Sequence, residues 1–325
     1  MSNDYFTNRQ DRYHVFSSKA ITDYFHKIHH TVCQLSYVIT PIPYIEEGYA
    51  IEWPEANLAA SPIFHPKEYL QKTGKILTEV IKPTTLPPTT TSSTLTPNTT
   101  VYPISQLTPL LIPDTSTELP AITSILETLA SPTYANSSWT FTAGYFNPHP
   151  SLTALLLSTA SKNNTVITAS PQANGFFGSK GISGLLPAAY TLLSRRFIEA
   201  AHKAGRSEDI TLREWRKGTV GEPGGWTYHA KGLWIALNGE KNPSISVVGS
   251  SNYTKRSYSL DLEVGSVIVT RDEGLMKALG EEKDALGSFE NTKVMTADDF
   301  ARSERRVGIT VRIAMWIVGK VGGAL

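Results

Sequence analysis

A histidine and a lysine two positions apart, followed by a small polar loop, are the residues of this chain best suited to chemistry. They are His229 and Lys231, and the loop is Gly249-Ser250-Ser251-Asn252. A histidine titrates near neutral pH, so it can act as a nucleophile or exchange protons. Lysine and asparagine side chains donate hydrogen bonds that suit phosphoryl oxygens. Together these residue types predict attack on a phosphate ester, and this chemistry requires no metal ion.

Acidic residues beyond the loop complete this group. Glu263 can accept the second ring N–H of a histidine, which fixes the tautomer and stabilises the imidazolium that forms during turnover. Asp261 is expected to share a strand face with Glu263. Simpler interpretations stay open, because a lone His-x-Lys is common, Asn252 can cap a helix, and both acids can face solvent.

Three expected strands must bring these residues together. They are apolar runs bounded by turn residues, at 228–237, 245–248 and 262–269. Because side chains alternate along a strand, His229 and Lys231 are expected on one face of the first strand. Asn252 follows the second strand in a loop. We therefore expect the three strands to converge on one polar pocket.

The rest of the carboxyl-terminal half alternates between strand and helix patterns. A strand that runs into a helix is expected over 139–148, with the start of the helix near Pro150 and Ser151. Further strands are expected at 166–170 and 210–215, and a second helix over 185–203. The second helix has apolar residues at helical spacing, which predicts packing on a sheet. This alternation places the chain in the α/β class.

The order and spacing of the candidate residues resemble the second half-site of the phospholipase D superfamily. The shared pattern is His-x-Lys, Gly-Ser-x-Asn, Arg256-Ser257, and an acid eleven positions after Asn252. Longer stretches resemble the phosphatidylglycerophosphate synthase family more specifically, over 172–181, 212–215 and 222–232. Ala236 stands where the superfamily pattern has an aspartate, a change that is typical of the synthase branch. The resemblance implies a phospholipase D-like mixed sheet flanked by helices, with one complete lobe and the remnant of a first lobe.

The same resemblance implies a reaction and a set of site residues. The reaction is transfer of a phosphatidyl group from CDP-diacylglycerol to glycerol 3-phosphate through a phosphohistidine, in phosphatidylglycerol and cardiolipin synthesis. His229 would be general acid and base, while Lys231 and Asn252 stabilise the transition state. The implied catalytic residues are His229, Lys231, Asn252 and Glu263, and the implied substrate-binding residues are Ser250, Ser251 and Arg256. No cofactor is implied.

The amino terminus resembles the tail of the first half-site in the same family, from Ser2 to Tyr13. In the family, a His-x-Lys and a Gly-Ala-Asn precede this stretch, and here they would fall before Met1. Asp11 then takes the place in the first half-site that Glu263 takes in the second. We therefore expect a chain that is truncated at its amino terminus and is either inactive alone or completed by pairing as a homodimer.

Three other functions stay open at this stage. The same donors suit a phosphodiesterase or nuclease in which water is the acceptor. They also suit a cardiolipin-synthase-like enzyme. The third alternative is a non-catalytic fragment that binds anionic lipid or an intact partner.

Composition and charge fit a globular protein with an anionic ligand. The 325 residues are 40% hydrophobic and carry a net charge of +1, which does not favour nucleic-acid binding. From Lys180 to Arg256, 12 basic residues face 6 acidic ones, an excess of 6 that suits an anionic substrate. A single cysteine, Cys33, excludes an intrachain disulfide. No targeting segment is predicted, yet the resemblance implies the mitochondrial inner membrane.

Four parts are predicted along the chain. Residues 1–82 are the remnant of the first lobe with a connecting segment, and 121–300 are the second lobe. Residues 83–120 are expected to be a disordered linker, because 15 of the 18 residues from Pro83 to Thr100 are proline, threonine or serine. Residues 301–325 should form a basic and apolar helix, too short to span a bilayer. It is expected either to lie on an anionic membrane surface or to dock on the domain.

Overall fold

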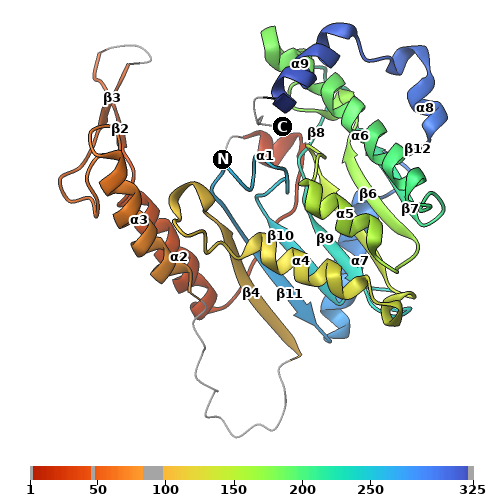
Figure 1. Ribbon diagram of the computed structural model, residues 1–325, viewed down its shortest axis with the longest axis horizontal. Coiled ribbons are helices and arrows are strands. Elements are labelled where there is room, and N and C mark those ends of the chain that lie inside the picture. The colour runs from red at the N-terminus through yellow and green to blue at the C-terminus, as the bar shows by residue number, and fades with distance from the viewer. Residues whose placement is uncertain (1–2, 45–47, 83–97, 321–325) are drawn as a thin grey trace, which may run out of the picture.

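An eight-stranded mixed sheet forms the centre of the computed structural model, which describes residues 3–44, 48–82 and 98–320 (Figure 1). Its strands run in the order β12 (Thr292–Met295), β7 (Ile210–Trp215), β6 (Asn164–Ala169), β5 (Ser138–Ala143), β9 (Lys231–Ala236), β10 (Ile245–Gly249), β11 (Glu263–Thr270) and β4 (Thr99–Gln106). The pairs β5·β6 and β6·β7 are parallel, and the other pairs in this sheet are antiparallel. The predicted α/β class and mixed sheet are confirmed.

Helices cover both faces of the sheet (Figure 1). One face carries α4 (Glu118–Leu129), α5 (Pro150–Ser158) and α6 (Leu186–Lys203). Their apolar side chains, such as Leu126 and Phe197, share the largest core cluster with Trp139. On the opposite face, α7 (Glu273–Leu286) packs against Trp215 and Trp234. The central strands of the sheet are therefore buried on both sides.

The expected strands are present, with one informative break. The first predicted run is divided at His229 and Ala230 into β8 (Thr227–Tyr228) and β9. β8 pairs in parallel with β1 (Arg9–Gln10) instead of continuing into the main sheet. The prediction that His229 and Lys231 share one strand face was wrong, because the backbone leaves the strand at His229 to pair with a segment some 218 residues away.

Part of the predicted linker is ordered. Residues 83–97 lie outside the described residues, but 98–120 contain β4, the turn η1 (Thr108–Leu110) and the start of α4. β4 pairs with the whole length of β11. The linker prediction was wrong for 98–120, because threonine, valine and isoleucine are β-branched and suit a strand once a partner is present.

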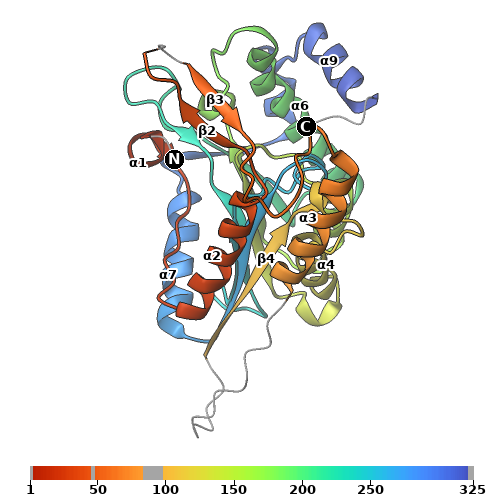
Figure 2. The same ribbon diagram turned by 90° about the vertical axis from the view of Figure 1, so that its left-hand side faces the viewer.

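The segment that follows the amino terminus forms a separate layer beside β4 (Figure 2). Its elements are α2 (Lys19–Cys33), the ribbon of β2 (Val38–Pro41) and β3 (Tyr49–Glu52), and α3 (Pro66–Ile81). The short helix α1 (Asp4–Thr7) lies apart from this layer, beside β8 (Figure 1). Leu77 of α3 packs with Leu107 and Leu111 in a second core cluster. The origin of residues 1–82 as the remnant of a first lobe stays a prediction.

The carboxyl-terminal segment crosses back over α6. It contains α8 (Ala297–Ala301), η5 (Ser303–Arg305) and α9 (Ile309–Lys320); the remaining short turns of the fold are η2 (Pro132–Tyr134), η3 (Pro171–Ala173) and η4 (Gly181–Leu185). Val311 and Met315 of α9 pack against Ala189 of α6. None of the helices in the described ranges is long and apolar enough to cross a membrane. Residues 321–325 of the predicted terminal helix lie outside the described residues.

Candidate active site

His229 and Asp11 form a hydrogen-bonded pair. Nδ1 of His229 lies 2.7 Å from Oδ2 of Asp11. Because a carboxylate only accepts hydrogen bonds, the ring proton is on Nδ1, which leaves Nε2 as a base. Burial lowers the pKa of His229, Lys231 lowers it further, and the hydrogen bond that Nδ1 donates to Asp11 opposes both. The imidazole is therefore mainly neutral at pH 7.

Backbone pairing explains why two residues so distant in the chain meet. The N–H of Thr227 donates to the carbonyl of Asn8 at 2.9 Å, and the N–H of His229 donates to the carbonyl of Gln10 at 2.8 Å. The second bond continues the pairing of β1 with β8 by one residue beyond the end of β8. Asp11 is the next residue after Gln10, so its carboxylate arrives beside the imidazole.

Two tyrosine rings enclose the imidazole. Tyr5 and Tyr145 meet the ring of His229 edge-on, with centroids at 5.7 Å and 6.2 Å. Arg9 in turn lies over the ring of Tyr5, at 4.2 Å from its centroid. The sequence analysis did not identify these tyrosines, because nothing in their local sequence marks them. They restrict the rotation of the imidazole and reduce its contact with water.

Lys231 lies at the base of the same site. Its side chain is buried, and its Nζ donates to the carbonyl of His229 at 2.5 Å. Burial lowers the pKa of Lys231 to about 8, while Asp11 and Glu263 favour its charged form. It is thus mostly protonated at pH 7.

The Gly-Ser-Ser-Asn loop is held from behind by buried groups. Ser251 is fully buried, and its Oγ accepts a hydrogen bond from the N–H of Tyr253 at 3.0 Å. Tyr253 has a left-handed φ of 60°, which turns the chain sharply after Asn252. Oδ1 of Asn252 is buried and has no hydrogen-bond partner within the described part of the chain. This atom retains capacity for a ligand.

A buried carboxyl group supports this loop and was not identified from the sequence. Glu118, at the start of α4, is 1% exposed and hydrogen-bonds to Ser251. Burial raises the pKa of Glu118 to about 7. The sequence could have predicted its burial, because Glu118 shares a helix face with the apolar residues Ile122, Leu126 and Leu129.

Glu263 occupies a different place from the one expected. Its carboxylate accepts a hydrogen bond from Oγ of Ser250 and does not pair with His229. Burial raises the pKa of Glu263, and Ser250 opposes this. The carboxylate that orients His229 is Asp11. Asp11 belongs to the pattern that resembles the first half-site, whereas His229 belongs to the pattern that resembles the second, so the hydrogen bond joins the two patterns.

A pocket of about 490 Å³ opens at this site. Four predicted residues line it, namely Asp11, His229, Lys231 and Ser250. Apolar side chains also line it, namely Phe16, Phe25, Val248 and Val264. Ser251, Asn252 and Glu263 are not among the residues that line it. Arg256 is exposed, with its Nε 3.1 Å from Oδ1 of Asp261.

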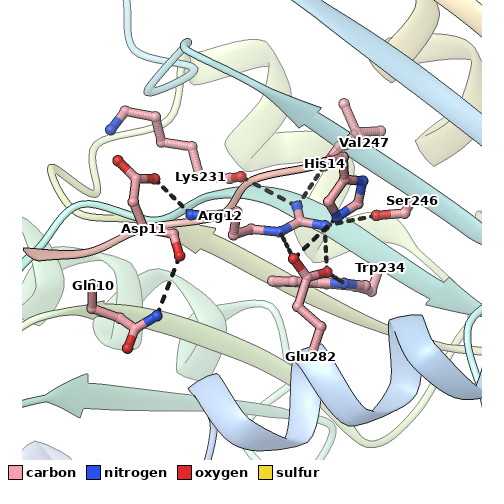
Figure 3. A network of polar contacts seen from close by, with 9 residues as sticks. All are labelled: Gln10, Asp11, Arg12, His14, Lys231, Trp234, Ser246, Val247 and Glu282. Atoms are coloured by element: carbon pink, nitrogen blue, oxygen red, sulfur yellow. Dashed lines mark hydrogen bonds and ion pairs between the residues drawn. The ribbon is translucent and has the colours of Figure 1, made fainter. Parts of the chain in front are cut away.

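The described residues contain no group of three or more His, Cys, Asp or Glu side chains that could hold a metal ion. Arg12, His14 and Glu282, which the sequence analysis did not identify, form a polar network beside the pocket (Figure 3). The chemistry that the site supports is acid and base catalysis next to a buried positive charge.

No known family model matches the chain. It is, however, 44% identical over 330 residues to the CDP-diacylglycerol–glycerol-3-phosphate 3-phosphatidyltransferase of Saccharomyces cerevisiae, covering 98% of this chain and 62% of that protein. The protein of the same name in Schizosaccharomyces pombe is 33% identical, over 87% of this chain and 61% of its own length. The human mitochondrial protein of the same name is 30% identical, over 96% of this chain and 56% of its own length. The chain spans about three-fifths of the length of these relatives.

A solved structure shows a related fold. The phosphatidylserine synthase of Haemophilus influenzae aligns with a TM-score of 0.53 at 20% identity, over 69% of this chain and 46% of that one. At this identity the likeness concerns the fold alone.

Proposed function

We propose, from the premise that this chain is a homologue of the CDP-diacylglycerol–glycerol-3-phosphate 3-phosphatidyltransferases, that its site transfers a phosphatidyl group from CDP-diacylglycerol to glycerol 3-phosphate. The products are phosphatidylglycerophosphate and CMP, in the route to phosphatidylglycerol and cardiolipin. The observation that carries this proposal is the Asp11–His229 pair above the buried charge of Lys231. The reaction proceeds without a cofactor.

Two displacements at phosphorus account for the transfer. In the first, a histidine nitrogen bonds to the phosphatidyl phosphorus while the P–O bond to CMP breaks, and CMP leaves with the bonding electrons. In the second, a hydroxyl oxygen of glycerol 3-phosphate bonds to phosphorus while the P–N bond breaks. A covalent intermediate of this kind lets an alcohol replace water as acceptor.

His229 serves as the proton-transfer partner in this scheme. The acceptor hydroxyl must lose its proton during the second displacement, and the lowered pKa of His229 keeps Nε2 unprotonated for that step. Lys231 stabilises the charge that develops on the non-bridging oxygens. Asn252 assists Lys231 by donating from its side-chain amide, and its unpaired Oδ1 can accept a hydrogen bond from a substrate hydroxyl. Ser250, which lines the pocket, completes the substrate-binding set, and the fully buried Ser251 supports the loop from behind. Arg256, on the exposed side of the loop, would meet the more distant charge of the substrate.

The nucleophile in this proposal is a second histidine. It comes from a preceding segment or from a second copy of the chain in a homodimer. Glu263 is the residue placed to orient it, because Glu263 corresponds in the second half-site to Asp11 in the first. If a second copy supplies the nucleophile, we expect the turnover rate per chain to rise with protein concentration, in parallel with dimer formation.

Apolar groups in the pocket favour a lipid over a nucleic acid. Phe16, Phe25 and Val264 line the pocket close to His229, where acyl chains or a diacylglycerol backbone would lie. A nucleic-acid site would instead follow the phosphate backbone with a groove of positive charge. Since the human relative is a mitochondrial protein, we also propose that this protein lies at the mitochondrial inner membrane, where fractionation of cells that express it would detect it.

A membrane-facing role for α9 follows from its two faces. Val311 and Met315 are buried on α6, whereas Ile313 and Trp316 are 53% and 64% exposed. Arg306, Arg312 and Lys320 supply positive charge, and residues 305–320 contain no acid. This pattern fits a helix that lies on an anionic bilayer with one face in the lipid.

The membrane role predicts the behaviour of an α9 variant. We expect Ile313→Ser with Trp316→Ser to reduce co-flotation with anionic vesicles at least about tenfold, because both side chains would lose burial in lipid. Phe289→Ser, which changes an apolar side chain that is 82% exposed elsewhere, is the matched control and should float like the unchanged protein. Equal flotation of all three proteins would count against the role of α9.

Product analysis tests the proposed reaction. Purified protein is incubated in mixed micelles with CDP-diacylglycerol and labelled glycerol 3-phosphate. We expect equal amounts of CMP and labelled phosphatidylglycerophosphate over many turnovers. When glycerol 3-phosphate is omitted, CMP should be released only in a burst that does not exceed the amount of active sites, because the covalent intermediate then has no acceptor. Phosphatidic acid released without the acceptor would identify a hydrolase instead. Absence of turnover across the whole range of protein concentration would favour a lipid-binding role.

A further inference from the structure

We infer that Arg12, held by Glu282, is a positioning residue that sets the Asp11 carboxylate against His229. Neither side chain takes part in the proposed chemistry. The inference deepens the proposed function, on which its kinetic consequences rest. Through Glu282, the helix α7 on the opposite face of the sheet then helps to fix the geometry of the site.

The guanidinium of Arg12 is inserted between two strands (Figure 3). Its side chain is 1% exposed. Nη1 donates to the carbonyls of Lys231 and Val247 at 3.2 Å and 2.8 Å, and Nη2 donates to Oγ of Ser246 at 3.0 Å. The indole of Trp234 stacks below it, with the centroid 3.8 Å from Cζ.

Glu282 of α7 closes this network. Its two oxygens accept hydrogen bonds from Nε and Nη2 of Arg12, at 3.0 Å and 2.9 Å. It also accepts from Nε1 of Trp234 at 2.9 Å, and His14 Nε2 lies 3.1 Å away. Hydrogen bonds from His14 and Arg12 lower the pKa of Glu282 to about 2 against the effect of burial. The carboxylate is therefore ionised throughout the neutral range, and the pair is bidentate and fixed in orientation.

The glycine directly after Lys231 makes room for the guanidinium. Gly232 has a φ of 147°, and a Cβ at this position would lie 1.9 Å from Nη1 of Arg12. The missing side chain therefore explains how an arginine can enter between β9 and β10. The residue that follows the His-x-Lys pair is thus adapted to receive Arg12.

The backbone connects this clamp to the catalytic pair. The N–H of Arg12 donates to Oδ1 of Asp11 at 2.9 Å, while Oδ2 of Asp11 meets Nδ1 of His229. Each oxygen of the carboxylate thus has one partner, and one of the two partners is the backbone of Arg12 itself. A shift of that backbone rotates the carboxylate away from the imidazole. In this way the Arg12 side chain controls the position of Asp11 without touching substrate.

Arg12→Met and Glu282→Gln are the test variants, and Arg206→Met is the matched control. Arg206 also binds backbone carbonyls, those of Thr159 and Ser161, and pairs with Asp209 at 3.1 Å, in a part of the fold away from the pocket. The three variants therefore share the loss of a partly buried arginine interaction, and only two of them disturb Asp11.

The first measurement is the pKa of His229, from NMR titration of ring-labelled protein with the resonance assigned by His229→Gln. We expect Arg12→Met to lower it, as Asp11→Asn does. Removal of a positive charge alone could only raise the pKa of a nearby histidine, so a fall reports the loss of Asp11. An unchanged or raised pKa in folded Arg12→Met would overturn the inference.

The second measurement is a kinetic cycle. We expect Glu282→Gln to reduce kcat by about tenfold to a hundredfold with little change in KM, because misplacement by about 1 Å has costs of this size. On an Asp11→Asn background, Glu282→Gln should cause no further loss, whereas multiplied losses would contradict the inference. Arg206→Met should lower the urea midpoint and leave both the pKa of His229 and kcat unchanged. The titration needs no turnover, so failure of the proposed reaction is distinguishable from failure of this inference.

Discussion

We expect His229→Gln to lower the rate of the proposed phosphatidyl transfer by about 10²–10⁴-fold, the range that a positioned proton-transfer group supplies. Glutamine retains a hydrogen-bond donor for Asp11 and approximates the volume of the ring, yet it cannot accept the proton of the acceptor hydroxyl. Substrate binding should change little, so KM for CDP-diacylglycerol stays within about threefold while kcat falls. Steady-state rates of CMP release provide the measurement.

A matched histidine variant separates this effect from general damage. His202→Gln changes a ring on α6 whose partner is Oγ of Ser207 at 3.2 Å, and it should retain full activity. A fall of less than tenfold in His229→Gln, with the control intact, would show that His229 is not the proton-transfer group. Equal losses in both variants would indicate a disturbed fold.

Asp11→Asn has the second largest expected effect. The amide can offer Nδ1 of His229 a donor in place of an acceptor, which favours the wrong tautomer and removes the charge that supports the imidazolium. A change of this kind lowers kcat by about 10²–10⁴-fold. The pH profile should move as well. Asp11 raises the pKa of His229, so its loss lowers that pKa further.

The direction of the pH shift follows from the proposed role of His229 as a general base. A general base is active above its pKa, so activity declines as pH falls through that value. In Asp11→Asn the remaining activity should therefore persist to lower pH than in the unchanged protein. The pH dependence of kcat checks this prediction. If the acidic limb of the profile moved to higher pH in Asp11→Asn, a charged Asp11 next to His229 would be excluded.

Local sequence patterns predicted most strands because each needs only short-range information. Residues 210–215 and 245–248 are apolar runs bounded by turn residues, and both are strands in the structure. The ordered edge strand β4 was missed for the same reason. Its threonine-rich sequence resembles a linker until β11 provides backbone partners along its whole length.

Burial of charged groups was harder to predict than secondary structure. Glu118 shares a helix face with apolar residues, a pattern that could have identified it as buried. No comparable pattern distinguishes Arg12, because its burial depends on a gap at Gly232 and on a carboxylate from α7. These partners lie more than 200 residues away along the chain.

The sequence determined which groups could do the chemistry, since a histidine, a lysine and an asparagine at this spacing are chemical facts of the chain. It also determined the strands that carry them, because hydrophobic periodicity acts over a few residues. Only the tertiary structure decided which carboxylate meets His229. The local pattern favoured Glu263, but pairing of β1 with β8 places Asp11 there at 2.7 Å. Hydrogen bonds depend on distance in space, and the fold brings together residues that sequence spacing keeps apart.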